Sequence, residues 1–204
     1  MHNPNGVTGF ECIDRTLQTG PETTALNLTM LIEGLYSSNI NNMISDSVKV
    51  YLRNSSSPYS LADSAKGVLS TSGSASFNFN NLLTGQYYIV VNHRNSIETW
   101  SRPGGEAFIS GSIIDYNMSD QITKAYGNNL KQVDTSPVRF ADFSGDVNQD
   151  GSVNLTDIIV IYNNVQNYSS GYIPTDINGD NITDLTDLII TFNNSSIFVT
   201  KITP

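Results

Sequence analysis

Apolar and polar residues alternate along much of the first two thirds of the chain. The alternation has a period of two at residues 26–32, 48–52 and 75–79. Because successive side chains of a strand point to opposite faces, this period predicts β-strands with one buried face. Residues 87–91, Tyr-Tyr-Ile-Val-Val, are apolar throughout and follow a Gly-Gln turn, which is typical of a central strand.

Shorter apolar segments extend the β pattern toward residue 142. Further candidate strands lie at residues 97–100, 107–110, 113–118 and 137–141. About seven short strands separated by Ser, Gly and Asn turns favour a mainly β fold. We therefore expect a β-sandwich of Ig-like or transthyretin-like type over residues 25–143.

The apolar pattern changes to a helical period in the last third of the chain. The same four-position pattern occurs twice, 30 residues apart, at Leu155, Ile158, Ile159 and Tyr162 and at Leu185, Leu188, Ile189 and Phe192. Spacings of i, i+3, i+4 and i+7 predict two amphipathic helices. Each helix is expected to end at an Asn-Asn pair, at residues 163–164 and 193–194.

A polar loop of twelve residues precedes each predicted helix. Ca²⁺ takes roughly six to eight oxygen ligands, which an EF-hand loop supplies from positions 1, 3, 5, 7, 9 and 12. These positions are Asp146, Asn148, Asp150, the Ser152 carbonyl, Asn154 (through water) and Asp157 in the first loop, and Asp176, Asn178, Asp180, the Ile182 carbonyl, Asp184 and Asp187 in the second. Every position carries an oxygen donor, so the sequence predicts two Ca²⁺ sites.

The second of these loops is expected to be the weaker. Position 6 requires a positive φ, which Gly151 adopts freely and Asn181 adopts at modest cost. Both loops end in Asp, which is shorter than the Glu of the general EF-hand pattern. We expect the metal ions to hold the small module together rather than to act as a signal, because binding energy absent from the unfolded chain becomes folding energy.

The duplicated loop-helix unit resembles the type I dockerin family. It opens with Gly-Asp-Val-Asn-x-Asp-Gly at residue 145, no helical pattern precedes either loop, and the resemblance extends to about residue 200. The resemblance implies a calcium-folded module that binds cohesin domains in extracellular bacterial assemblies through loop positions 10 and 11. Those positions hold Leu-Thr twice, at residues 155–156 and 185–186, which is similar to the family's ability to present either half to a partner.

The order of the two parts carries a second resemblance. A sandwich followed by such a module is similar to the Ig-like X module joined to a dockerin in cellulosomal scaffolds. Residues 85–101 also resemble a segment found beside dockerin-like repeats in uncharacterised secreted bacterial proteins. No flexible linker precedes Asp146, and residues 158–161 are apolar on more than one helix face. We therefore expect residues 25–143 and 144–204 to share an interface.

Composition limits the partners of the chain. Its 204 residues carry a net charge of -9, and no basic stripe is present to neutralise phosphates, so nucleic acid and anionic membrane are poor partners. No apolar run approaches the roughly 20 residues of a membrane span. The single Cys12 excludes an intrachain disulfide.

An extracellular or cell-surface location suits the predicted calcium loops, because extracellular calcium is abundant. The start of the chain lacks the pattern of a signal peptide, so we expect a mature form, an engineered form or an incomplete gene product. Asn-x-Ser/Thr sequons permit surface glycans at Asn27, Asn54, Asn117, Asn167 and Asn194.

Residues 1–24 have too few apolar residues to fold alone. We expect them to form an extended arm that either lies on its own domain or adds a strand to a neighbouring copy. In the second case the contact is heterologous, and copies of the protein would assemble head to tail into a filament.

Little in the sequence suggests catalysis. His93, with Arg94, Glu98 and Trp100 nearby, is the one cluster that resembles a site, and a His at a strand end is more often a hydrogen-bonding surface group. We therefore expect no enzyme. A Lys-Asn crosslink of the kind known in some surface β-sandwiches could use Lys49, and the sequence selects no partner for it.

Three hypotheses of function follow. The first is a non-catalytic extracellular assembly protein with two structural Ca²⁺ ions, which joins other copies of itself. The second is a dockerin-type anchor that binds a separate cohesin-like protein. The third is a carbohydrate-binding module, whose sugar-stacking platform would consist of Tyr51, Tyr59, Tyr87, Tyr88 and Trp100.

Overall fold

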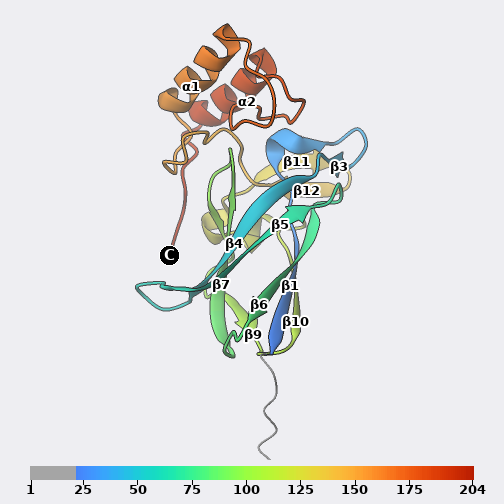
Figure 1. Ribbon diagram of the computed structural model, residues 1–204, viewed down its shortest axis with the longest axis vertical. Coiled ribbons are helices and arrows are strands. Elements are labelled where there is room, and N and C mark those ends of the chain that lie inside the picture. The colour runs from blue at the N-terminus through green and yellow to red at the C-terminus, as the bar shows by residue number, and fades with distance from the viewer. Residues whose placement is uncertain (1–21) are drawn as a thin grey trace, which may run out of the picture.

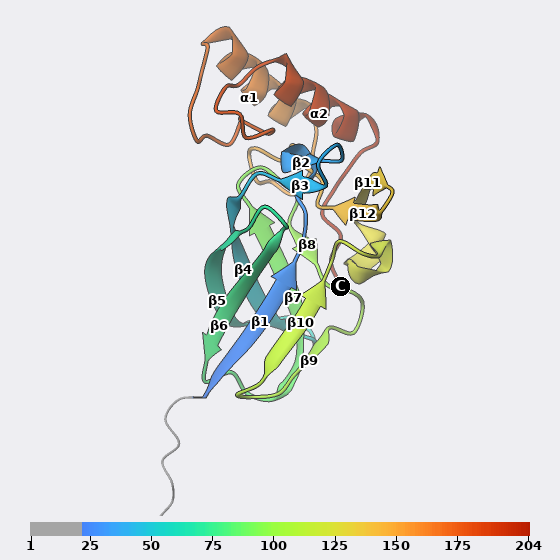
Figure 2. The same ribbon diagram turned by 90° about the vertical axis from the view of Figure 1, so that its right-hand side faces the viewer.

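Two β-sheets pack face to face in the computed structural model, which describes residues 22–204 (Figures 1 and 2). One sheet has the order β10-β1-β6, from strands β1 (Thr23–Thr29), β6 (Ser74–Asn80) and β10 (Ile113–Asn117). The other has the order β5-β4-β7-β8, from β4 (Asp46–Asn54), β5 (Leu61–Leu69), β7 (Gly85–His93) and β8 (Thr99–Trp100), with β9 (Glu106–Phe108) also paired to β7. Strand β10 runs parallel to β1, and the other pairs are antiparallel.

Smaller elements cover the end of the sandwich that faces the two helices. They are the 3₁₀ turns η1 (Glu33–Leu35), η2 (Ile122–Lys124) and η3 (Tyr126–Asn128) and the short strands β2 (Tyr36–Ser37), β3 (Asn42–Met43), β11 (Lys131–Thr135) and β12 (Val138–Ala141). Helices α1 (Leu155–Gln166) and α2 (Leu185–Ser196) lie side by side beyond them (Figure 1). The chain is therefore mainly β, with both helices at one end.

The core of the sandwich follows the alternation in the sequence. On β4 the side chains of Val48, Val50 and Leu52 are at most 1% exposed, while Lys49 between them is exposed. Burial of each such side chain stabilises the fold by about 1.5–3 kcal/mol. Strand β7 is buried on both faces, because a second apolar cluster around Trp100 covers its outer side. The prediction of a central strand at residues 87–91 is confirmed.

The structure differs from the sequence predictions for the β part in three places. Strand β5 was not predicted, because it is an edge strand with mostly exposed residues and no clear alternation. Strand β11 was missed for the same reason. Strand β1 begins at Thr23, so residues 23 and 24 belong to the sandwich rather than to the arm. The rest of the predicted arm, residues 1–21 with Cys12, lies outside the described residues, and its role in assembly stays a prediction.

The helices begin where the sequence predicts and end later. Each helix begins one residue after its N-cap, which is loop position 9 and forms a capping box with the Asp at position 12. The N-cap side chain accepts from backbone amides at the start of the helix, and the Asp side chain accepts from the N-cap amide. They continue two residues past the Asn-Asn pairs that were expected to end them. Asn has a low helix propensity but does not break a helix that is held by packing.

Candidate metal centre

The two loops fold on their own carboxylates in the same way. Asp157, at position 12 of the first loop, accepts hydrogen bonds from the backbone amides of Val147, Asn148 and Asn154 at 3.0–3.2 Å. Thirty residues later Asp187 accepts the equivalent three bonds at 2.7–3.0 Å. One side chain therefore ties the start of each loop to the start of its helix. The Asp side chain at this position is long enough to reach all three amides.

The first aspartate of each loop turns inward. Asp146 accepts bonds from the amides of Asp150 and Gly151, both at 3.1 Å. The residues at position 6 have positive φ angles, 91° at Gly151 and 69° at Asn181, as the sequence predicts. Within each loop, positions 3 and 5 are in contact, with Asn148 donating to Asp150 and Asn178 donating to Asp180 from their side-chain amides.

Burial disfavours the charged form of the loop carboxylates. Asp146 and Asp157 are 2% and 0% exposed, and neither forms an ion pair with a residue of the described chain. Burial raises the pKa of Asp146 to about 6 against the hydrogen bond from Gly151, and the carboxylates of Asp157 and Asp150 add to the rise. Burial raises the pKa of Asp157 as well. A buried carboxylate of this kind is neutralised either by protonation or by a cation nearby.

The second loop shows the same imbalance with one difference. Burial raises the pKa of Asp176 and of Asp187. Arg94 of the sandwich partly offsets this at Asp176, with its Nη2 atom 3.9 Å from a carboxylate oxygen. The second loop therefore already has part of the positive charge that the first loop lacks, and its weaker affinity for a metal ion stays a prediction.

The donor chemistry of both loops fits a hard cation through a mixed set of ligands. In residues 22–204 no group of three or more His, Cys, Asp or Glu side chains is placed so that it could hold a metal ion by itself. The predicted set has three Asp side chains in the first loop and four in the second, with Asn side chains and a backbone carbonyl at the other positions, so the described arrangement of the loops does not bring these Asp side chains together as a metal-binding group. The residues that would hold Ca²⁺ are the twelve named above, and calcium itself stays a prediction.

Each loop pairs with the segment that follows the other helix. Val153 N donates to Val199 O at 2.9 Å, after α2, and Thr183 N donates to Ser169 O at 2.9 Å, after α1. These contacts are related by the repeat of 30 residues, so the module has an approximate twofold symmetry. The C-terminal segment then returns from α2 to the sandwich, where Asn129 Nδ2 donates to Thr200 O at 3.0 Å (Figure 1).

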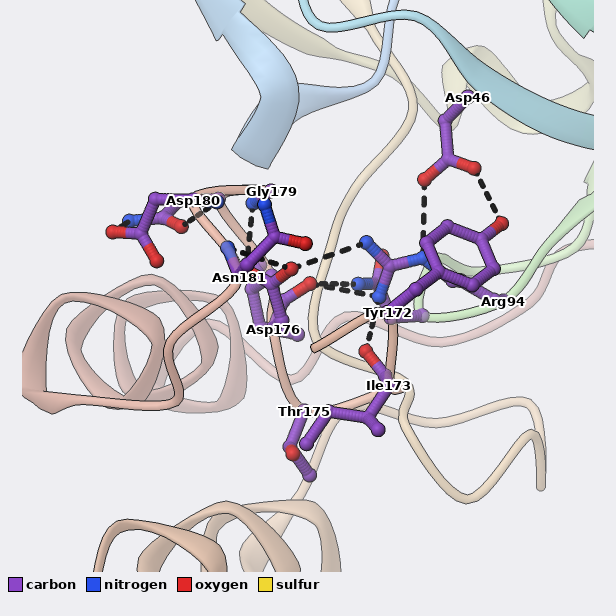
Figure 3. Close-up of polar contacts among 12 residues, drawn as sticks. Asp46, Arg94, Tyr172, Ile173, Thr175, Asp176, Gly179, Asp180 and Asn181 are labelled. Atoms are coloured by element: carbon purple, nitrogen blue, oxygen red, sulfur yellow. Dashed lines mark hydrogen bonds and ion pairs between the residues drawn. The ribbon is translucent and has the colours of Figure 1, made fainter. Parts of the chain in front are cut away.

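The loop between β7 and β8 joins both candidate metal loops to the sandwich. Arg94 donates from Nη1 to the carbonyl of Asp176 at 2.8 Å and to that of Ile173, and from Nε to Asp46 of β4 at 3.0 Å (Figure 3). Its guanidinium also lies 4.6 Å from the centre of the Tyr172 ring. Two residues after Arg94, the carbonyl of Ser96 accepts a hydrogen bond from Gln149 of the first loop at 3.2 Å.

Apolar contacts also join the sandwich to residues 144–204, as predicted from the absence of a flexible linker before Asp146. Ile97 of the sandwich packs with Val153 and Val199 in a small buried cluster. On the other side η1 lies against the second loop so closely that a Cβ atom on Gly34 would overlap the carbonyl oxygen of Ile177. Residues 25–143 and 144–204 therefore share an interface. The sequence indicated this interface mainly through the absence of a flexible linker before Asp146.

The His93 cluster is buried rather than exposed, so the sequence expectation of a surface group was wrong. His93 is 1% exposed and bonds to Asp46 and to Ser96, both at 3.1 Å. Burial lowers the pKa of His93, and hydrogen bonds from His93 and Tyr172 hold that of Asp46 below its usual value although burial opposes them. Ser96 is 0% exposed, so this Asp-His-Ser arrangement offers no hydroxyl to a substrate.

Three further expectations need correction. The aromatic platform is not exposed: Tyr87, Tyr88 and Trp100 are at most 7% exposed and pack edge to face with their neighbours. Lys49 stands exposed on the outer face of β4, opposite Lys66 of β5 on one side and the half-buried Asn92 of β7 on the other. The sequon at Asn194 is 0% exposed, so the folded protein offers no acceptor there.

The apolar stripes of the helices point outward, which the sequence pattern did not indicate. Three matching positions are exposed on both helices: Leu155 (65%) and Leu185 (64%), Ile159 (48%) and Ile189 (58%), and Tyr162 (50%) and Phe192 (59%). Their inner faces instead bury Asp157, Ile161 and the corresponding residues of α2. We call these six exposed side chains the helix face.

Comparisons with known proteins give distant matches only. No protein-family model matches the chain, and no curated protein matches it. Two solved structures of the type II cohesin-X-dockerin complex from Acetivibrio cellulolyticus are similar at 16% sequence identity, each over 86% of this chain and 98% of the matched chain. The TM-score is 0.46 for a C-terminal interface mutant and 0.45 for an N-terminal interface mutant. No helix of the described chain has the length and apolarity to cross a membrane.

Proposed function

We propose that the protein is a non-catalytic extracellular assembly component. In this proposal residues 144–204 form a dockerin-like module that binds two Ca²⁺ ions, and the helix face docks on a cohesin-like protein. The buried carboxylates of Asp146 and Asp157, without a cation of the chain beside them, support the calcium sites. Millimolar extracellular calcium suits loops of this composition.

The helix face is the observation that carries the proposal of a protein partner. Six large apolar side chains remain exposed on two short helices, at positions that the repeat makes equivalent. Monomeric proteins rarely expose such patches unless they bind something. Amphipathic helices that present anchors at i, i+4 and i+7 commonly dock on a complementary apolar surface.

Calcium has a structural role in this proposal. The metal ions would neutralise the loop acids and hold both helices in register, while residues 92–98 and η1 fix the module on the sandwich. An ion that binds only the folded chain stabilises it by an amount that grows with the logarithm of the ion concentration. The rigid junction would set the direction in which the helix face is presented.

The proposal is tested by pull-down of purified cohesins with the full chain in calcium and in chelator. We expect the chain to be captured in calcium and not in chelator. Because each helix contributes three equivalent residues to the helix face, we expect Leu155→Asp or Leu185→Asp singly to retain binding and the double variant to lose it. Retention by the double variant, with its melting temperature unchanged, would refute docking through the helix face. Self-association through residues 1–24 stays a prediction, which deletion of residues 1–21 tests by sedimentation.

A further inference from the structure

Three reactive side chains from distant parts of the chain meet where α2 approaches the sandwich. Lys131 of β11 contacts the Oε1 atom of Glu33 in η1, and its Nζ atom lies 3.1 Å from Oδ1 of Asn194 in α2. Asn194 in turn donates from Nδ2 to Oε2 of Glu33 at 2.6 Å. A lysine amine, a carboxamide and a carboxyl group are therefore in mutual contact.

The carboxamide of Asn194 is held in one orientation. Its Nδ2 atom donates to the Ser144 carbonyl at 2.7 Å as well as to Glu33, so its oxygen faces the lysine. Asn194 is 0% exposed, and the side chains of Glu33 and Lys131 are 10% and 31% exposed. Such a fixed arrangement of reactants raises the rate of an intramolecular reaction greatly over the same reaction in solution.

We propose that Lys131 and Asn194 become joined by an isopeptide bond, with Glu33 as the catalytic residue. Glu33 takes a proton from the Lys131 ammonium, and the neutral Nζ attacks Cγ of Asn194. The Nζ–Cγ bond forms and the Cγ–Nδ2 bond breaks. The remaining surplus proton of Nζ moves to Nδ2, and the leaving ammonia takes up the proton that Glu33 holds. The sum is one lysine ammonium and one carboxamide converted into one secondary amide and one ammonium ion, with no change of oxidation state.

Glu33 contacts both the attacking and the leaving nitrogen, which this step requires. Its Oε1 atom faces Nζ of Lys131, and its Oε2 atom faces Nδ2 of Asn194. A carboxyl group positioned between the two nitrogens acts as base for one and acid for the other. The Ser144 amide, which donates to Oε2 at 3.1 Å, keeps that group in place.

The internal repeat supplies a comparison within the same molecule. Asn164 occupies in α1 the position that Asn194 occupies in α2, and its Nδ2 atom donates to the Val160 carbonyl of its own helix at 3.0 Å. It is not buried. The site at Asn194 is therefore built by partners from the sandwich and is not a general property of the helix repeat. The bond would tie α2 covalently to β11, across the junction of the two parts.

Intact-mass measurement of the full chain tests the proposal. We expect the wild type to weigh less than its sequence by the mass of one ammonia molecule. A tryptic map should contain one branched peptide that joins Lys131 to Asn194, with no cleavage after Lys131. Lys131→Arg and Glu33→Gln should restore the full mass and abolish the branched peptide, and Asn164→Ala should change neither result beyond its own substitution.

Two outcomes would overturn the proposal. The first is a wild-type mass equal to that of the sequence after prolonged incubation of the folded protein. The second is loss of ammonia without a branched peptide, since a succinimide at Asn194-Ser195 gives the same mass loss and would persist in Lys131→Arg. Circular dichroism identifies any variant that fails to fold, and the wild-type peptide map decides the matter without the variants.

Discussion

Replacement of Arg94 by Met should weaken the junction between the sandwich and the second loop. The Arg94 side chain is 13% exposed and forms hydrogen bonds of 3.0 Å to Asp46 and 2.8 Å to the Asp176 carbonyl. Removal of one partner from a buried charged pair costs about 3–5 kcal/mol when the other charge is left without a partner. Asp46 keeps its hydrogen bonds to His93 and Tyr172, so we expect a loss of about 1.5–3 kcal/mol, as for a hydrogen bond to a charged group. Met retains most of the apolar stem, so the loss would report on the polar contacts.

This loss is a substantial fraction of the whole stability of a domain, which is about 5–15 kcal/mol. Urea unfolding followed by the fluorescence of Trp100, the one tryptophan of the chain, measures it. Arg139→Met is a matched control, because Arg139 is half-buried and has no side-chain hydrogen bond or ion pair in the described chain. We expect the control to change the free energy of unfolding by about 0.5 kcal/mol or less.

Two results would refute this account of the junction. One is a loss in Arg94→Met no larger than that in the Arg139→Met control. The other comes from calorimetry of the wild type, as two separate melting transitions of which a chelator shifts one alone. A single transition that a chelator shifts as a whole is the expected result, because the two parts share an interface.

Three further predictions follow from the structure. Gly34→Ala should destabilise the fold by about 1–3 kcal/mol in thermal unfolding, because the added Cβ atom would overlap the Ile177 carbonyl oxygen. An unchanged melting temperature would show that η1 can move away from the second loop without cost. Burial raises the pKa of Asp142 well above its usual value, so this group should make the protein more stable as pH falls toward the unfolded pKa of about 4. In urea unfolding at several pH values, Asp142→Asn should remove this part of the rise, and the part due to the loop carboxylates, whose pKa values are also raised, should remain. Ile189→Asp should leave the free energy of unfolding within about 0.5 kcal/mol of wild type, since the side chain is 58% exposed; a larger loss would mean that the helix face is part of the core.

The sequence predicts the strands and loops where local chemistry determines them. A period of two identifies β4 and β6, and the repeat of 30 residues identifies both helices with their loops. Strand β5 escapes because an edge strand needs no apolar face. Its position depends on hydrogen bonds to the backbone of β4, and such pairing cannot be predicted from the local sequence of β5.

The contacts between distant residues could not be read from the chain. The apolar stripes of the helices gave the correct period and the wrong direction, because a pattern cannot show which face meets the rest of the molecule. His93 was misplaced for the same reason, since its burial depends on Asp46 of another strand. The group of Lys131, Glu33 and Asn194 exists only after folding.

Calorimetric titration of the chelator-treated full chain with Ca²⁺ tests the central claim most directly. We expect two ions bound per chain, the tighter one lost in Asp146→Ala and the weaker one in Asp176→Ala, with a higher melting temperature after each ion binds. Absence of binding heat at millimolar Ca²⁺, together with a melting temperature that calcium leaves unchanged, would contradict the account.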